Sequence, residues 1–399
     1  MWLIEALKPH CEIAVLTTGG WDLSVLNSYY GTQVRSDEVR VRIAPVPFPF
    51  RQLDSAALRG ACYQRFAREV ANEYDLRISA YNFTDWGMPA IHFIADFSWH
   101  PQLRDQLDSH APGFIYQDTL ARKAYLKFVQ ALHRPSRRDL LREDTILANS
   151  LWSAALVKDR CGVNCAAVVY PPVWDEFPEV PCQEKEPAFA MIGRVTPEKR
   201  IDRAIAILEA IRQLGHDIRL HLCGEIKDDY YGSKIAKLCN MHADWIITHG
   251  LVSGHAKQQI LANCSFGIQA RDAEPFGIAV AEMVKSGAIV FAPNNGGQAE
   301  IINCQALLFS DVPDAVNKIC AVLENKAMQA ELRTHLSLQA KLFNAKVFMQ
   351  TSREIIFRFA QSGGELGSTE QEGDDSPGYE NKVLETRQAA KNHAVSPRI

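Results

Sequence analysis

Two carboxylates separated by seven residues, Glu274 and Glu282, bound the segment whose residue types point most clearly to chemistry. Between them, Pro275 fixes a turn and Gly277 permits the backbone to approach a ligand closely. A helix is predicted from Ile278, and the free N–H groups at a helix N-terminus attract anions such as phosphate. Glu274 precedes that helix and Glu282 lies in its second turn, so we expect them to contact different parts of one long ligand. Taken singly, each carboxylate is better explained as a loop or solvated helix residue.

A second group of polar residues follows the predicted strand 188–193. Gly193 ends this strand, Arg194 offers a planar fork suited to phosphate oxygens, and Lys199 adds a mobile point charge. Parallel α/β sheets bind ligands at the carboxyl ends of their strands, which is where these two cations lie. The alternative is a pair of surface cations around a helix start.

A third turn, Pro293 to Gly297, follows the predicted strand 288–292 and precedes Glu300. Its consecutive glycines, Gly296 and Gly297, are compatible with a close approach of the backbone to a ligand. A plain strand-to-helix turn uses glycines in the same way, so the alternative stays open.

Parallel sheets are needed to bring such loops together, and the hydrophobic pattern predicts two of them. Short β-branched runs alternate with segments of helical period along most of the chain. In the first half, strands are predicted at 12–16, 39–44, 76–81, 90–94, 145–148 and 166–169. In the second half, they are predicted at 188–193, 218–223, 245–248, 264–269, 288–292 and 306–309. A linker is predicted at 170–186, and a helix between the first two strands of the second half places one apolar stripe on the sheet, namely Ile201, Ile205, Leu208, Ile211 and Leu214.

Composition restricts the function further. The 399 residues are 47% hydrophobic and 23% charged, with a net charge of -4, which gives no global reason to expect nucleic acid as a partner. Ten cysteines without C-x-x-C spacing indicate reduced thiols, and the pair Cys161 and Cys165 is better explained as small buried hydrophobes than as metal ligands. There is no apolar run of about 20 residues and no secretory signal, so we expect a cytoplasmic protein.

The three loops together resemble the retaining glycosyltransferases of family 4, also called group 1, over about residues 189–309. The resemblance implies an α/β GT-B fold, with two Rossmann-like doubly wound domains facing across a cleft. It implies that Glu274 contacts the donor sugar, Glu282 the nucleotide ribose, and Arg194 and Lys199 the diphosphate. The remaining implied donor-binding residues are Gly193, Phe276, Gly277, Ile278 and, in the turn 249–252 that lines the base, Val252.

The implied domains are an acceptor domain at 1–175, a donor domain at 176–342, a helix at 343–361 that crosses back to the first domain, and a disordered tail at 362–399 rich in Gly, Ser and acid. Family members open with a strand and a Gly-rich loop ahead of the first helix, whereas residues 1–7 here resemble the end of that helix. We therefore expect either a chain truncated at its amino terminus or a first domain rebuilt around Gly19 and Gly20.

The acceptor side departs from the family pattern. The family tends to have a histidine where this chain has Ala95, which leaves His92, Asp96 and His100 as candidates. A histidine inside an apolar strand, such as His92, is more often structural. The basic run 134–138 could contact anionic lipid, but neighbouring acidic residues favour a solvated face.

The sequence therefore predicts a hexosyltransferase that uses a UDP-, GDP- or ADP-sugar, retains anomeric configuration and needs neither metal nor cofactor. Its acceptor is a sugar, a lipid or another small molecule. The alternatives are a catalytically impaired glycosyltransferase-like binding or scaffolding protein and, more remotely, a nucleotide-sugar epimerase.

Overall fold

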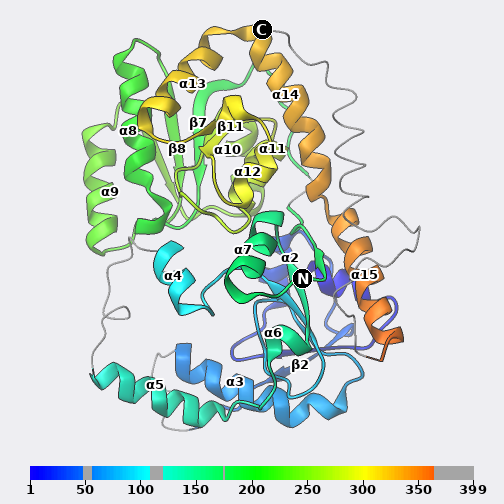
Figure 1. Ribbon diagram of the computed structural model, residues 1–399. Helices are drawn as coiled ribbons and strands as arrows, with labels where there is room; N and C mark the ends of the chain where they lie inside the picture. Colours follow the sequence, from blue (N-terminus) through cyan, green and yellow to red (C-terminus); the bar gives the residue numbers. More distant parts are fainter. Residues whose placement is uncertain (48–55, 108–119, 174–175, 364–399) are drawn as a thin grey trace. The chain divides into compact units, whose positions relative to one another are not determined.

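A computed structural model describes residues 1–47, 56–107, 120–173 and 176–363. The chain divides into two compact units, one made of Met1–Trp174 with Ala345–Leu366 and the other containing Asp175–Asn344. Each unit is α/β with parallel strands (Figure 1). The predicted tail from residue 364 onward lies outside the described residues.

The second unit is built on a six-stranded parallel sheet of order β12-β11-β10-β7-β8-β9. Its strands are β7 Glu186–Ile192, β8 Arg219–Cys223, β9 Ile246–Gly250, β10 Cys264–Ile268, β11 Ile289–Pro293 and β12 Leu308–Phe309. Its helices are α8 Ile201–Gln213, α9 Tyr230–Met241, α10 Gly254–Asn263, α11 Ile278–Lys285, α12 Gly297–Ile302, α13 Val312–Glu324 and α14 Lys326–Ala340. All six strands predicted here are confirmed to within two residues, because each is an apolar run bounded by polar turns.

The apolar stripe predicted for α8 is confirmed at four of its five positions. Ile201, Ile205, Leu208 and Ile211 are buried, whereas Leu214 is 65% exposed. The prediction for Leu214 is wrong because the helix ends at Gln213 and Gly215 takes a left-handed φ of 98°, so Leu214 turns away from the sheet. Strands β10 and β11 are buried along their whole length, as expected for the middle of a parallel sheet.

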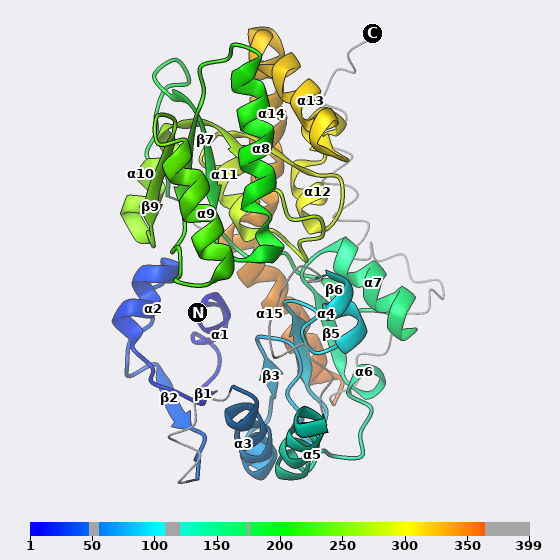
Figure 2. The ribbon, with the colours of Figure 1, turned by 90° about the vertical axis from the view of Figure 1, so that its left-hand side faces the viewer.

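The first unit contains a four-stranded parallel sheet of order β3-β4-β5-β6 and a separate parallel pair, β1-β2. The strands are β1 Ile13–Thr17, β2 Val39–Ile43, β3 Ile78–Ser79, β4 Ile91–Ile94, β5 Thr145–Ala148 and β6 Ala167–Val168. The helices are α1 Trp2–Leu7, α2 Leu23–Tyr30, α3 Ala56–Val70, α4 Pro101–Leu107, α5 Leu120–His133, α6 Leu140–Glu143, α7 Leu151–Cys161 and α15 Ala345–Gln361. Within the described residues β1 pairs only with β2 and β3 only with β4, so the ladder is interrupted between them (Figure 2).

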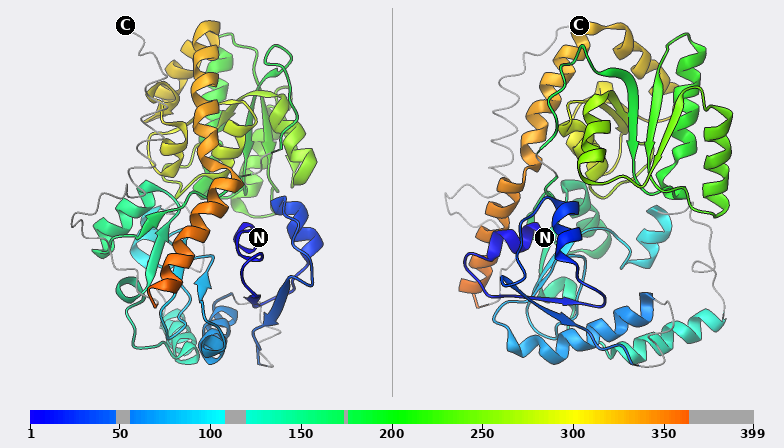
Figure 3. Two further views of the ribbon diagram at one scale, coloured as in Figure 1. Left: turned by 90° about the vertical axis from the view of Figure 1, so that its right-hand side faces the viewer. Right: turned by 180° about the vertical axis from the view of Figure 1, so that it is seen from behind.

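The late helix predicted at 343–361 is α15, which packs into the first unit. Ile356 and Phe359 join Leu7 of α1 and Leu147 of β5 in one buried cluster. Figure 3 shows α15, in orange, alongside the other elements of this unit. The segment predicted as a linker, 170–186, has no helix or strand at 170–173 and 176–185, but its last residue, Glu186, is the first residue of β7. Tyr170 is nevertheless buried, so the start of the linker packs against the protein. Among the described helices, none is long and apolar enough to span a membrane.

Candidate functional site

The site is formed where three loops of the second unit meet at the carboxyl ends of β7, β10 and β11. In the loop after β10, Glu274 forms an isolated parallel bridge with Gly296, which belongs to the loop after β11. In the loop after β7, Lys199 extends its Nζ to within 2.6 Å of the Oε2 atom of Glu274. The structure therefore brings Glu274 and Lys199, which are 75 residues apart, into direct contact.

Two cations hold the Glu274 carboxylate from either side. Lys199 contacts Oε2, and the Nη1 atom of Arg271 donates to Oε1 over 3.3 Å. The side chains of Lys199, Glu274 and Arg271 are only 15%, 14% and 11% exposed. Burial alone would raise the pKa of the Glu274 carboxyl, but the charges of Lys199 and Arg271 outweigh it and lower the pKa below its usual value. Glu274 is therefore ionised at neutral pH. Its contribution to the free energy of unfolding is fully present above the usual carboxyl pKa and is lost as the pH falls from there through the lowered pKa.

The loop after β7 is shaped to let Lys199 reach inward. Gly193 has φ 148°, a value that L side chains rarely adopt, and the position of its missing Cβ lies 3.8 Å from the Cε atom of Lys199. A side chain at this position would be strained. Gly193 therefore permits the turn that leads to Lys199.

Arg194, the second predicted phosphate cation, is placed differently. Its side chain is 78% exposed, and its nearest charged partner is Glu198, 3.6 Å from Nη2. An exposed pair at this distance fixes a side chain only weakly. Lys199 is thus positioned in advance of any ligand, whereas Arg194 projects into solvent.

Helix α11 begins beside the Glu274 loop without a side-chain cap. Its N-cap is Gly277, whose φ of 105° is left-handed, and the first-turn residue Ile278 is 52% exposed. Phe276 is buried and packs edge to face against Phe343. An uncapped N-terminus presents N–H donors and a partial positive charge, which suits an anionic group.

Glu282 lies further along α11 and is separately paired. Its Oε1 atom is 2.5 Å from the Nζ of Lys257 in α10, and the two side chains are 11% and 15% exposed. The two glutamates of the segment thus each have their own lysine. Their two roles toward the donor stay predictions.

The predicted base-lining turn, 249–252, begins in the last two residues of β9 and leads through Ser253 into α10. Val252 is half-buried there and Leu251 is 80% exposed. His249 anchors the turn, because its Nε2 lies 2.9 Å from the Nδ1 of His221, whose Nε2 lies 3.1 Å from Glu186. Burial and the neighbouring His221 lower the pKa of His249.

The glycines of the third loop approach the protein's own backbone. The amide of Gly297 donates to the carbonyl of Glu274 over 2.8 Å. A Cβ at Gly297 would lie 2.5 Å from the carbonyl oxygen of Pro275, and one at Gly296 would lie 2.5 Å from that of Glu274. In this structure the close approach that these glycines permit is therefore one between two loops, and it fixes the position of Glu274.

We expect the substitution Gly297→Ala to reduce the free energy of unfolding by about 1–3 kcal/mol, because the added methyl group cannot fit without moving the Glu274 loop. Urea unfolding measures this loss. Gly60→Ala is the control, since Gly60 lies within α3 and its added Cβ would meet no atom within 4 Å. Equal stability of the Gly297→Ala variant and the wild type would contradict the packing described.

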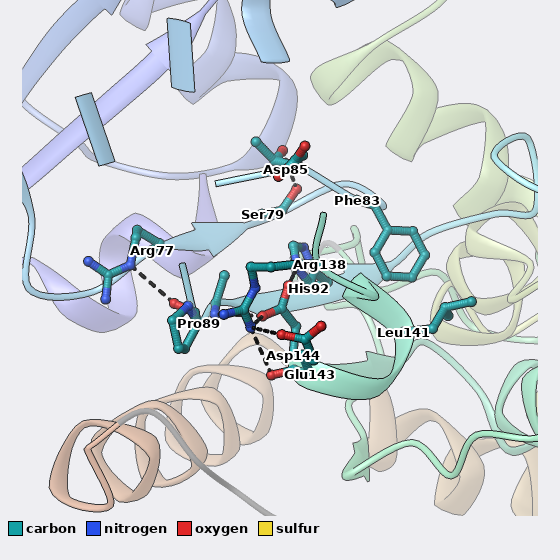
Figure 4. A network of polar contacts seen from close by, with 12 residues as sticks. Arg77, Ser79, Phe83, Asp85, Pro89, His92, Arg138, Leu141, Glu143 and Asp144 are labelled. Carbon is teal, nitrogen blue, oxygen red and sulfur yellow. Dashed lines mark hydrogen bonds and ion pairs between the residues drawn. The ribbon is translucent and has the colours of Figure 1, made fainter. Parts of the chain in front are cut away.

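Of the three acceptor-side candidates, His92 is enclosed in a polar network of the first unit (Figure 4). Its side chain is fully buried, and its Nε2 lies 2.9 Å from the Oδ2 of Asp144, which is 1% exposed. The Oδ1 of Asp144 accepts from the Nη2 of Arg138 over 2.9 Å and from the backbone N–H of Ala90 over 3.2 Å. This geometry gives His92 a structural position, and it commits Arg138 of the basic run to the interior.

Asp96 and His100 lie beyond the end of β4. Asp96 accepts hydrogen bonds from Tyr81, from the side-chain amide of Asn82 and from both the backbone and hydroxyl of Ser98. Burial opposes ionisation of Asp96, but these hydrogen bonds outweigh it and lower its pKa. The ring Nδ1 of His100 accepts from the amide of Leu103 over 3.4 Å, at the start of α4. Asp96 is thus extensively bonded within its own loops, and both roles stay predictions.

Sequence reasoning did not find Arg271, Lys257 or Asp144. Arg271 had a local signal, since it is a cation three residues before Glu274 in the same loop. Lys257 and Asp144 had no local signal, because each pairs with a residue that is distant in sequence, namely Glu282 and His92. Among the described residues, no group of three His, Cys, Asp or Glu side chains is placed to hold a metal ion.

Comparison with known proteins bears on this site directly. Residues 173–342, which contain all three loops, match the family model for glycosyl transferases group 1. This segment is therefore similar to the group 1 glycosyl transferases. Curated relatives include the protein named GDP-Man:Man(3)GlcNAc(2)-PP-Dol alpha-1,2-mannosyltransferase in Mus musculus, 27% identical over 172 residues, and its namesake in Neurospora crassa, 30% identical over 185 residues. Each alignment covers 39% of this chain, which spans only about a third (35% and 33%) of the relatives' length.

Solved structures that resemble this chain extend over residues of both units. HepE of Anabaena in complex with UDP-glucose has a TM-score of 0.61 at 15% identity and covers 90% of this chain and 95% of its own. WaaG, a glycosyltransferase involved in lipopolysaccharide biosynthesis, has a TM-score of 0.62 at 14% identity, with coverages of 89% and 94%. Sucrose-phosphate synthase of Thermosynechococcus elongatus has a TM-score of 0.67 at 16% identity, with coverages of 90% and 92%. The fold is therefore GT-B, as the sequence predicted.

Proposed function

We propose that this chain transfers a hexose from a nucleoside diphosphate sugar to a hydroxylated acceptor, with retention of anomeric configuration. The observation that supports this proposal best is the Lys199–Glu274 contact of 2.6 Å beside the uncapped start of α11. It provides a cation and helix N–H groups for a diphosphate next to a carboxylate for sugar hydroxyls, all within the segment that matches the group 1 family model.

In the proposed mechanism, the protein lowers the activation free energy mainly by binding the donor and stabilising charge. Lys199 and the N-terminus of α11 stabilise the negative charge that develops on the departing diphosphate, and Arg194 closes on it when donor binds. Glu274 stays ionised between Lys199 and Arg271 and orients the sugar by accepting its hydroxyl hydrogen bonds. These positive groups are proposed to take the place of a metal ion or other cofactor.

The donor proposed first is GDP-mannose, because both curated relatives of the matched segment are named for GDP-Man. UDP- and ADP-sugars remain in the comparison, since one structural neighbour was solved with UDP-glucose. The acceptor proposed is a sugar, including one on a lipid pyrophosphate as in the relatives' printed names, and we assign it to the first unit.

A panel of UDP-, GDP- and ADP-sugars tests the proposal. We expect one donor to bind in the micromolar to millimolar range typical of enzyme substrates, to be hydrolysed slowly alone, and to be consumed faster when mannosides or lipid-linked glycans are added. Mass spectrometry of the product and NMR of its anomeric proton measure transfer and stereochemistry. Absence of binding to every donor would refute the proposal.

A glycosyltransferase-like binding protein without catalysis is the second candidate. The observation that favours it is the interrupted ladder of the first unit, where β1-β2 and β3-β4-β5-β6 are separate sheets. Donor binding without hydrolysis or transfer in the same panel would support this candidate. Isomerisation of the donor without acceptor would instead indicate an epimerase.

A further inference from the structure

Lys257 lies close to the donor site but has no role in the mechanism above. It is the fourth residue of α10, and its Nζ is 2.5 Å from the Oε1 atom of Glu282 in α11. Both side chains are largely buried, at 15% and 11% exposure. A carboxylate so enclosed needs a compensating charge, and Lys257 is the cation that contacts it among the described residues.

The contact leaves one oxygen of Glu282 for a ligand. Oε1 is occupied by Lys257, while within the described ranges of the chain no side chain or amide is hydrogen-bonded to Oε2. A carboxylate oxygen accepts hydrogen bonds only, so its natural partner is a hydroxyl or N–H donor. The cis-diol of a ribose is such a donor.

Lys257 is also connected to the turn before its helix. The predicted base-lining turn 249–252 leads through Ser253 directly into α10. The ion pair of Lys257 with Glu282 therefore links the helix that follows this turn to α11. A rigid ion pair between the two helices would hold the Oε2 atom of Glu282, the proposed acceptor for the ribose hydroxyls, at a fixed distance from the turn that is proposed to contact the base.

We propose that Lys257 is a positioning residue that orients Glu282 toward the ribose hydroxyls of the donor nucleotide. This inference rests on the proposed function, because it assigns a nucleotide to this site. It predicts that Lys257 determines how strongly the protein distinguishes ribose from a sugar without its 2′- and 3′-hydroxyls.

The test measures binding of GDP and UDP, and of their 2′,3′-dideoxy analogues, to the full chain by calorimetry. We expect the wild type to prefer the ribonucleotide about 10- to 100-fold, as for a hydrogen bond to a charged group. Lys257→Met should remove most of that preference, because it weakens the binding of the ribonucleotide and leaves the binding of the dideoxy analogue unchanged. In turnover, the KM for donor should rise by a similar factor while kcat changes by less than about threefold.

Matched variants separate positioning from stability. Lys257→Arg keeps the charge and should restore the preference. Lys257→Met with Glu282→Gln removes both charges, so it should fold normally and still lack the preference. Lys234→Met breaks an interhelical pair of the same unit, 2.8 Å from Asp202 but 47% exposed at the lysine, and should leave the preference unchanged.

The outcomes distinguish this inference from the proposed function. A wild-type preference that survives Lys257→Met, or a wild type that binds both forms of a nucleotide equally, would overturn the role of Lys257 while leaving nucleotide binding established. A wild type that binds neither GDP nor UDP would refute the inference and count against the proposed function, which the donor panel tests separately with ADP-sugars.

Discussion

Replacing Lys199 with Ala is expected to lower the turnover of the donor by about 10²–10³-fold, the loss typical when a group that stabilises transition-state charge is removed. The reason is twofold. The proposed diphosphate loses a cation that is already fixed at the site, and the buried Glu274 loses the closer of its two positive partners, at 2.6 Å. Because that partner lowers the pKa of Glu274, the substitution raises it, and activity should fall further at the acidic end of the pH profile.

Arg194→Ala is the informative comparison, because Arg194 is exposed and not fixed in advance. We expect this variant mainly to raise the KM for donor, with a smaller loss of kcat. Lys234→Ala, which removes an exposed cation far from the Glu274 loop in sequence, serves as the neutral control. If the turnover of Lys199→Ala were within about threefold of that of the wild type, the proposal that Lys199 contacts the diphosphate would be refuted.

The loops of the second unit were predictable because their signals are local. Gly277 precedes a helix and adopts a left-handed φ, and Gly193 ends a strand in a conformation disfavoured for other residues. The strands before them are apolar runs that a period-two or fully buried pattern reveals. Such signals depend on backbone geometry, which neighbouring residues dictate.

Side-chain partners were not predictable in the same way. Arg271 contributes to neutralising Glu274, and Lys257 neutralises Glu282. Which cation approaches a carboxylate depends on how loops and helices pack, and the local sequence does not describe that packing. The partner of a glycine was equally hard to predict. A close approach of Gly296 and Gly297 to a ligand was considered from the sequence, but in the structure these glycines approach the backbone of Glu274 and Pro275. The strands of the first unit were also predicted to within two residues, whereas their division into the sheets β1-β2 and β3-β4-β5-β6 depends on packing.

Asp144 in the first unit is expected to be among the most sensitive positions for stability. Asp144→Ala removes the partner of the buried His92 and of Arg138 and frees the amide of Ala90. Breaking a buried, hydrogen-bonded charge pair costs about 3–5 kcal/mol because the remaining group stays desolvated. Urea unfolding of the variant, followed by fluorescence, measures the loss of free energy.

Asp159→Ala provides the matched control, because its carboxylate is 72% exposed and pairs with the neighbouring Arg160. An exposed pair of this kind contributes about 0–1 kcal/mol, so the control should unfold like the wild type. His92→Leu separates structure from catalysis. If His92 is structural, this variant loses stability while its turnover per folded molecule is retained, because the ring is fully buried and has no surface to offer an acceptor. Loss of turnover at unchanged stability would instead place His92 in the chemistry, and a stable Asp144→Ala variant would contradict the energetic role of the network.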